Sequence, residues 1–401
     1  MSARVPLVLT GGFRLFFTAA AITAIGAMTA WMGWIGILAT DIVISEPSFA
    51  VAPQYWHSHE MIFGYAVAVI AGFFLTAVPN WTGEKEARWV FVSIVGGIWL
   101  AGRIAVWFSA WIDPVIVAAL DLAFLPLLSW RLASNLIKRP KPQNVALLGL
   151  LGLIFAGNVM IHMEWAGLTD DTARRGLWLA LFAICALIAV IGGRITPAFT
   201  RNVMLRNGIE NGLPVSRAVF ERSGIISALI LGPAYACGAP EWLLGSIALV
   251  AAVTNGARIA GWRSRATFSS PILWALHLGF AMLVLGYALL AASWLTGWPH
   301  PVAAMHGLAI GAIGGMPMAM MTRAPLGHTG RALTVRPAIA VAYLLIPLAM
   351  VIRVFGTGVF PQFYNWVILL SGAIWVVTYA IYIFIYWPVL TGPDERAANH
   401  S

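Results

Sequence analysis

Long apolar runs separated by short polar stretches make up most of the chain. Runs of roughly 20 residues, each about long enough to cross a hydrocarbon core of ~30 Å, recur from Leu15 to Pro388. Their boundaries at charged residues, prolines and glycines predict twelve transmembrane helices, at residues 15–40, 60–80, 89–110, 114–136, 144–165, 177–200, 216–237, 241–262, 271–296, 302–323, 335–355 and 363–388. The pattern therefore predicts an all-α, polytopic membrane protein that forms a single integral-membrane domain over residues 1–401.

Basic residues predict how these helices are oriented. Cytoplasmic loops of membrane proteins are enriched in lysine and arginine. Here such residues fall before the first span and after every second span, as in Arg14, Lys85, Lys138, Arg206, Arg265 and Arg331. Arg174 and Arg175 are the one exception. Both termini are therefore predicted to be cytoplasmic, and because the loops are short, the function must lie among the helices.

Composition excludes several classes of protein. With 60% hydrophobic and 10% charged residues, the chain does not resemble a soluble domain, in which about a quarter of the residues are charged. The chain has 24 basic and 15 acidic residues. In a membrane protein such an excess of basic residues indicates which loops are cytoplasmic, so it does not imply a nucleic-acid partner. Cys185 and Cys237 lie in apolar runs, which argues against a disulfide framework or a thiolate metal site.

An internal repeat relates the second predicted span to the tenth. Four residues recur at a shift of 247 positions: His59, Gly64, Thr82 and Gly83 correspond to His306, Gly311, Thr329 and Gly330. Arg103 on the third span and Arg353 on the eleventh are related by a shift of 250. We predict repeated four-helix units about an axis along the membrane normal. Coincidence of glycine and threonine in a biased composition is the alternative explanation.

Histidines supply the candidate ligands, because ionisable groups at membrane depth are costly and mark pathways, cofactors or internal pairs. The predicted orientation places five near the outer face, namely His57, His59, His162, His300 and His306, and two near the inner face, namely His277 and His328. The predicted metal ligands among them are His57, His59, His306, His277 and His328. Imidazole is a common ligand of copper, zinc and haem iron. Because His59 and His306 occupy matching positions of the repeat, they could face each other, either as the two axial ligands of one haem or as ligands of one metal ion bound between helices. Anchoring of helix ends among lipid headgroups is the alternative.

The segment from Trp56 to Glu60 is the sharpest local signal. Its two histidines, His57 and His59, stand two residues apart at the start of the second span, so that one ring can point inward while the other reaches along the surface. Two roles suit Glu60: it accepts a hydrogen bond that holds an imidazole in one tautomer, or it provides a favourable negative charge in the first helical turn.

Four arginines within the spans require counter-anions. Arg103 and Arg353 are level with the outer histidines and fit the two propionates of a haem, with snorkelling to the interface as the alternative. Arg194 and Arg258 are predicted to lie on the inner side of the membrane, as are His277 and His328. The two arginines either bind a second cofactor or are ordinary positive charges at the cytoplasmic face.

Several longer motifs carry a family resemblance. They are Gly12-Phe13-Arg14, Trp56-His57-Ser58-His59-Glu60-Met61, Val78-Pro79-Asn80-Trp81-Thr82-Gly83, Gly192-Gly193-Arg194, Met305-His306-Gly307 and Leu326-Gly327-His328-Thr329-Gly330-Arg331. Through these motifs the whole chain resembles the NnrS family of bacterial inner-membrane proteins. Pro317 departs from the pattern expected for the family, which affects the local bend of the tenth span.

The resemblance implies a multi-pass protein of the bacterial cytoplasmic membrane that contains haem and copper and takes part in denitrification and protection against nitric oxide. It assigns no catalytic residue. We expect nitric oxide or a related molecule as ligand, with a membrane or periplasmic electron donor. Three kinds of protein stay open: a haem-dependent nitrogen-oxide oxidoreductase, a metal- or haem-dependent sensor, and a twelve-helix secondary transporter.

Overall fold

The computed structural model describes residues 5–40, 47–138 and 142–395. All regular secondary structure in these ranges is helical, which confirms the prediction of an all-α protein. Eleven of the described helices are long and apolar enough to cross a membrane, so the protein is a multi-pass membrane protein. The helix over the seventh predicted span is not among the eleven, because Glu221 and Arg222 interrupt its apolar run. The count of twelve spans stays a prediction.

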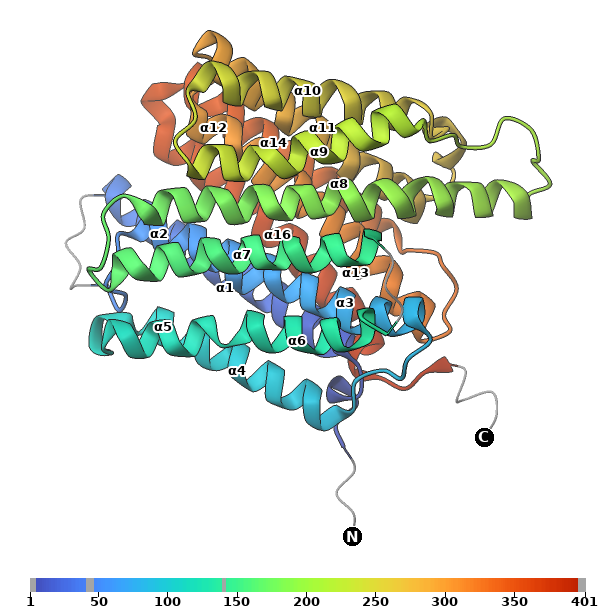
Figure 1. Cartoon of the computed structure of the whole chain (residues 1–401), viewed down its shortest axis with the longest axis horizontal. Coiled ribbons are helices and arrows are strands. Elements are labelled where there is room, and N and C mark those ends of the chain that lie inside the picture. The colour runs from blue at the N-terminus through green and yellow to red at the C-terminus, as the bar shows by residue number, and fades with distance from the viewer. Residues whose placement is uncertain (1–4, 41–46, 139–141, 396–401) are drawn as a thin grey trace. The chain divides into compact units, whose positions relative to one another are not determined.

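The helices, which are labelled in Figure 1, belong to two compact units. Unit 1 comprises residues 1–180, 323–332 and 379–401, and unit 2 comprises residues 181–322 and 333–378. The first half of the chain contributes α1 (Gly12–Thr40), α2 (Pro53–His59), α3 (Val67–Thr82), α4 (Trp89–Trp107), α5 (Pro114–Leu122), α6 (Phe124–Leu136), α7 (Pro142–Trp165) and α8 (Thr172–Arg206). The second half contributes α9 (Ala218–Ala236), α10 (Glu241–Ala260), α11 (Pro271–Thr296), α12 (Pro301–His306), α13 (Ile313–His328), α14 (Pro337–Val351), α15 (Thr357–Val359) and α16 (Tyr364–Thr391).

Several helices extend beyond the apolar runs from which they were predicted. The second span begins at Pro53 rather than at residue 60, because proline suits the first turn of a helix. His57 and His59 therefore lie within a helix rather than at its start. Helix α8 continues past both ends of residues 177–200, because arginine is a good helix former although it is polar.

Three short π-helical segments interrupt the long helices: η2 (Glu60–Ala66), η5 (Gly307–Ala312) and η6 (Ile352–Gly356). Such segments often occur at functional sites. The first two begin directly after His59 and His306, so their starts are separated by the same 247 positions as the repeat. Arg353 lies in the third. The four-helix repeat itself stays a prediction.

Small residues allow close helix packing in unit 1. Helix α1 packs against η2 and α3, and its buried face includes Ala20, Ala24 and Ala27. Small side chains at a helix interface let two backbones approach, which is the usual basis of packing within a bilayer. Helix α5 packs against both α4 and α7, so these three helices bring side chains to a common interior.

Arg14 ties the start of the chain to its end. Its guanidinium donates hydrogen bonds to the carbonyl oxygens of Leu390 and Gly392, both at 2.8 Å, and pairs with Asp394 at 2.6 Å. Cationic side chains suit the C-terminal end of a helix, where carbonyl groups are left over. The arginine of the first family motif therefore has a structural role at the end of α16.

Candidate metal centre

Unit 1 contains a buried cluster of polar side chains, which we call the His–Asp cluster. Its members come from four separate parts of the chain: His59 from α2, Glu60 from the start of η2, Arg103 from α4, Asp121 from α5, and Asn158 and His162 from α7. Each is at most 6% exposed. Charged and imidazole side chains so far from water require partners, and each of these has them within the cluster.

Two histidines and one carboxylate converge at the centre of the His–Asp cluster. The Oδ2 atom of Asp121 lies 3.2 Å from Nε2 of His59 and 2.9 Å from Nε2 of His162. One ligand atom from each residue lies within 4.8 Å of the other two, which is close enough for all three to contact one ion. Two imidazoles and a carboxylate form a donor set that suits iron, copper or zinc.

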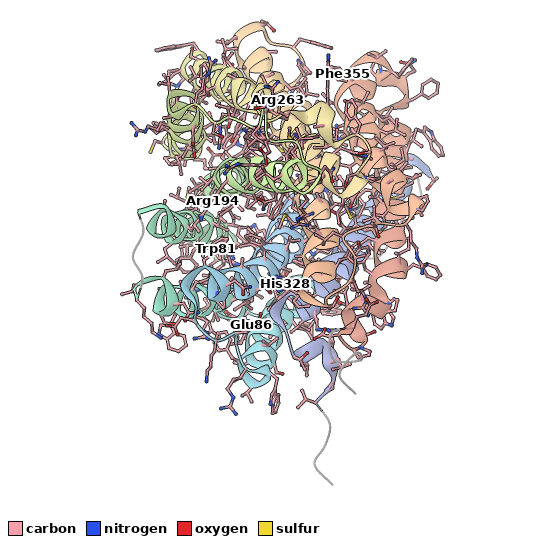
Figure 2. All side chains as sticks on the ribbon, turned by 90° about the vertical axis from the view of Figure 1, so that its right-hand side faces the viewer. Trp81, Glu86, Arg194, Arg263, His328 and Phe355 are labelled. Carbon is pink, nitrogen blue, oxygen red and sulfur yellow. The ribbon has the colours of Figure 1, made fainter. Side chains whose placement is uncertain are left out.

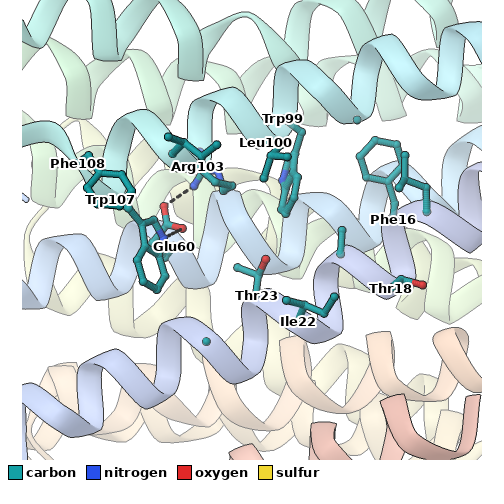
Figure 3. A pocket seen from close by; sticks show the side chains of 15 residues that line it. Phe16, Thr18, Ile22, Thr23, Glu60, Trp99, Leu100, Arg103, Trp107 and Phe108 are labelled. Carbon is teal, nitrogen blue, oxygen red and sulfur yellow. Dashed lines mark hydrogen bonds and ion pairs between the residues drawn. The ribbon is translucent and has the colours of Figure 1, made fainter. Parts of the chain in front are cut away.

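A network of carboxylates and donors surrounds this centre, and Figure 3 shows its part at Glu60, Arg103 and Trp107. Arg103 Nη1 donates to Glu60 Oε1 at 2.5 Å, and Nη2 donates to Asp121 Oδ1. The indole Nε1 of Trp107 donates to Glu60 Oε2 at 2.8 Å. With both imidazoles neutral, the two carboxylates and one guanidinium leave a formal charge of −1. A bound cation would offset that buried charge.

Asn158 joins the two sides of the centre. Its Nδ2 donates to Asp121 Oδ2 at 2.8 Å, and its Oδ1 lies 3.0 Å from His59 Nε2. Because Asn158 and His162 stand four residues apart, they project from the same face of α7. One helical face thus supplies both a ligand and the group that orients its neighbours.

Two glycines make room for the charged network. A Cβ atom on Gly64 would lie 2.8 Å from Thr23 and 3.2 Å from Glu60 Oε2. A Cβ atom on Gly102 would lie 3.0 Å from both the backbone and the side chain of Asp121. Only a residue without a side chain lets α4 and α5 approach this closely.

The predicted residues of unit 1 take different places. His59 is at the centre of the His–Asp cluster, whereas the ring of His57 stacks on Trp31 with centroids 4.7 Å apart. Glu60 Oε1 lies 3.5 Å from His59 Nδ1. Arg103 has two protein carboxylates as counter-anions, so its pairing with haem propionates stays a prediction. His328 is exposed and lies against Phe13 (Figure 2).

Among the residues that the structure describes, the hydrogen-bond partners of two predicted residues of unit 2 are neutral. Arg258 is 2% exposed and donates to the carbonyl oxygen of Ala189 at 2.9 Å and to Asn255 Oδ1 at 2.8 Å. The ring nitrogens of His277 lie 2.8 Å from the hydroxyl of Thr200 and 2.9 Å from that of Ser264. Neither set includes a carboxylate.

The other predicted residues of unit 2 are His306, Arg353 and Arg194. The Nδ1 atom of His306 lies 2.6 Å from the carbonyl oxygen of Val302. Arg353 is buried and bonds to Tyr364, whereas Arg194 is exposed on α8 (Figure 2). Because His59 belongs to unit 1 and His306 to unit 2, the shared site predicted for them stays a prediction, and so does the pairing of His277 with His328.

Sequence reasoning did not select Asp121, Asn158 and His162 as site residues. A signal was present, since Asp121 is the only acidic residue within the span predicted at 114–136. A carboxylate at membrane depth is itself a mark of function. The sequence could not reveal that α5 and α7 bring this carboxylate to His59.

The space around His59 fits an ion and does not fit a haem. A haem requires an open, flat space beside its axial imidazole. His59 is fully buried, with ring centroids of Phe63, Trp165 and His162 at 4.7, 5.0 and 5.6 Å. These rings occupy the space that a porphyrin would need.

Comparison with known protein families identifies the family of this chain. The family model described as NnrS protein matches residues 7–394, nearly the whole chain. No curated protein matches the chain.

Proposed function

Because the chain belongs to the NnrS family, we propose that it is a metal-containing protein of the bacterial cytoplasmic membrane that takes part in the response to nitric oxide. Family membership suggests the link to nitric oxide. The observation that carries the metal assignment is the convergence of His59, His162 and Asp121 within 4.8 Å in the membrane-spanning part of the chain. Copper is the ion that we assign to this centre.

The surrounding residues have separate roles in this proposal. His59, His162 and Asp121 hold the ion, which when bound supplies a redox-active position for nitric oxide or a related nitrogen oxide. Before the ion binds, Asn158 orients Asp121 and His59 through its two hydrogen bonds. Arg103 holds the second oxygen of Asp121, so that Oδ2 faces the two imidazoles. The fixed geometry keeps the ligands in place before the ion binds.

We assign the haem to His306 rather than to His59. A ligating histidine commonly donates its second ring N–H to a backbone carbonyl, which fixes the tautomer. The 2.6 Å contact between His306 Nδ1 and Val302 supports a proton on Nδ1 and a lone pair on Nε2. Arg353 is a candidate partner for a propionate. An inner site at His277 and His328, with Arg194 and Arg258, is the weaker assignment, because hydroxyl groups already satisfy His277.

Metal analysis and nitric oxide titration of the purified protein test this function. We expect about one copper ion per chain, a haem absorption band, and spectral changes on anaerobic addition of nitric oxide. Asp121→Asn should remove the copper and leave the haem, and His306→Ala should do the reverse. Asp113→Asn, at the exposed residue that caps the N-terminus of the same helix α5, is the control. Full copper content in Asp121→Asn would contradict the assignment.

A further inference from the structure

An elongated pocket of about 520 Å³ lies between α1 and α4 in unit 1 (Figure 3). Its walls are apolar side chains such as Phe16, Ile22, Trp99, Leu100 and Ile104. A pocket of this size is within the range that holds small organic ligands. Among the residues that line it, the network of the site described above includes Glu60, Arg103 and Trp107.

The pocket has a distinct polar end. Glu60, Arg103 and Trp107 lie together at one end, and Phe16 and Thr18 lie at the other (Figure 3). The lining residues extend over positions 15 to 26 of α1, which is roughly 16 Å along a helix that rises 1.5 Å per residue. A ligand that fills this space has a compact polar head and a long apolar tail.

The outer wall of the pocket faces the bilayer. Ile22, Leu100 and Ile104 line it and are 56%, 51% and 50% exposed. They belong to helices that cross the membrane, so their exposed surfaces contact lipid chains. A molecule dissolved in the bilayer can therefore reach the pocket without passing through water.

Charge at the polar end selects among such molecules. In the metal-free protein, Glu60 and Asp121 carry two negative charges against the single positive charge of Arg103, which disfavours a phosphate headgroup. Glu60 Oε2 accepts from Trp107 and has a further lone pair, so it can accept a hydrogen bond from a neutral hydroxyl. A diatomic gas needs little more volume than the ~30 Å³ of a water molecule, far less than the pocket provides.

We propose that this pocket binds a membrane-dissolved hydroquinone, with a ring hydroxyl donating to Glu60 and the alkyl tail lying between α1 and α4. The hydroquinone class combines a neutral hydrogen-bond-donating head with an apolar tail. Glu60 Oε1 lies 3.5 Å from His59 Nδ1, so the hydroquinone would bind next to the metal centre. In that respect the proposal rests on the proposed function.

Photolabelling of the full-length protein tests the binding. The probe is a hydroquinone with a diazirine in its alkyl tail, and the labelled peptides are identified by mass spectrometry. We expect labels within residues 15–26 or 96–108, reduced at least fivefold by excess decylubiquinol and unaffected by excess phosphatidylglycerol. Labels elsewhere, or displacement by phosphatidylglycerol alone, would overturn the proposal in favour of a lipid.

Variants that fill the pocket provide the matched comparison. Ala19→Phe places a ring among the lining residues, whereas Ala119→Phe places one on the exposed face of α5. We expect at least a tenfold loss of labelling in the first and none in the second. If Ala19→Phe does not fold, Leu100→Trp narrows the pocket from α4 instead. Wild-type labelling in a folded filling variant would overturn the proposal.

Metal content measured on the same samples separates this proposal from the proposed function. Labelling is carried out on metal-loaded protein and on protein treated with a chelator. Specific labelling of protein that takes up no copper on metal loading would leave the hydroquinone site intact and contradict the metal assignment. Copper bound in full with no specific labelling would do the opposite.

Discussion

The buried arginines and histidines of the two units have different kinds of hydrogen-bond partner. In unit 1, Arg103 and His59 contact the carboxylates of Glu60 and Asp121. In unit 2, Arg258 contacts a carbonyl oxygen and an amide, and His277 contacts two hydroxyl groups. Both arrangements are buried within membrane-spanning helices, yet only the first carries negative charge among its direct partners.

That difference separates a cation site from a structural contact. A carboxylate beside two imidazoles attracts a metal ion, whereas hydroxyl and carbonyl groups satisfy an imidazole or a guanidinium without creating such a site. Arg258 also lies against Gly193, where any Cβ atom would come within 1.9 Å of its Nη2. We therefore interpret the contacts of Arg258 as packing between α8 and α10.

Removal of Asp121 should have the largest effect on this comparison. Asp121→Asn keeps the shape of the side chain but takes away the carboxylate that joins His59, His162 and Arg103. We expect copper affinity to fall by at least ~100-fold, since loss of even an indirect partner of a ligand costs roughly 10–100-fold. Equilibrium dialysis with copper measures it. An affinity within twofold of the wild-type value would show that the carboxylate is not a ligand.

Exchange of each buried arginine for methionine sharpens the comparison. Arg103→Met leaves two carboxylates without their counter-charge, so we expect a loss of about 3–5 kcal/mol in the free energy of unfolding. Copper should restore part of this loss, because the ion replaces the missing positive charge. Unfolding in denaturant with and without copper measures both effects. Equal losses in the two conditions would contradict the role given to the cation.

The corresponding change in unit 2 should be smaller. Arg258→Met removes a charge whose direct partners are neutral, and we expect a loss of about 1–3 kcal/mol from the acceptors left unsatisfied. Copper should not alter this value. If copper stabilised Arg258→Met as much as Arg103→Met, the two units would not differ in the way described.

His277→Ala tests the structural role of its two hydroxyl contacts. We expect a loss of about 1–2 kcal/mol in stability from two hydrogen bonds, with unchanged copper and haem content. The measurement is metal and haem analysis alongside unfolding. Loss of one haem equivalent would instead support the inner cofactor site.

The smallest effect is expected for Trp107→Phe. This variant keeps the aromatic ring and removes only the donor to Glu60, so the loss in stability should be about 1 kcal/mol. Copper content should stay as in the wild type. Substantial copper loss in this variant would extend the metal site to Glu60.

The hydrophobic pattern was sufficient to predict an all-α membrane protein and most helix positions. Runs of apolar residues mark the part of a helix that lies in lipid, but not its polar ends. This is why the second span begins earlier than predicted, with α2, and why α8 is longer than predicted. Glu221 and Arg222 lie near the start of the continuous helix α9, and the apolar residues that follow them were sufficient to predict a span there.

The site could be predicted only in part. His59 was selected because histidine is rare within spans and stands in a distinctive motif. Asp121 and His162 were not, because their importance comes from the packing of α5 against α7, a contact between segments some 40 residues apart in sequence. A pattern read along one helix carries no information about which neighbouring helix faces it.

Pulsed electron paramagnetic resonance of the copper-loaded protein tests the central claim most directly, because it counts the imidazole nitrogens coupled to the ion. We predict two coupled imidazoles in the wild type and one in both His59→Ala and His162→Ala, with His57→Ala unchanged. Two coupled imidazoles in His162→Ala, or a signal that is lost only in His57→Ala, would contradict a metal centre formed by His59, Asp121 and His162.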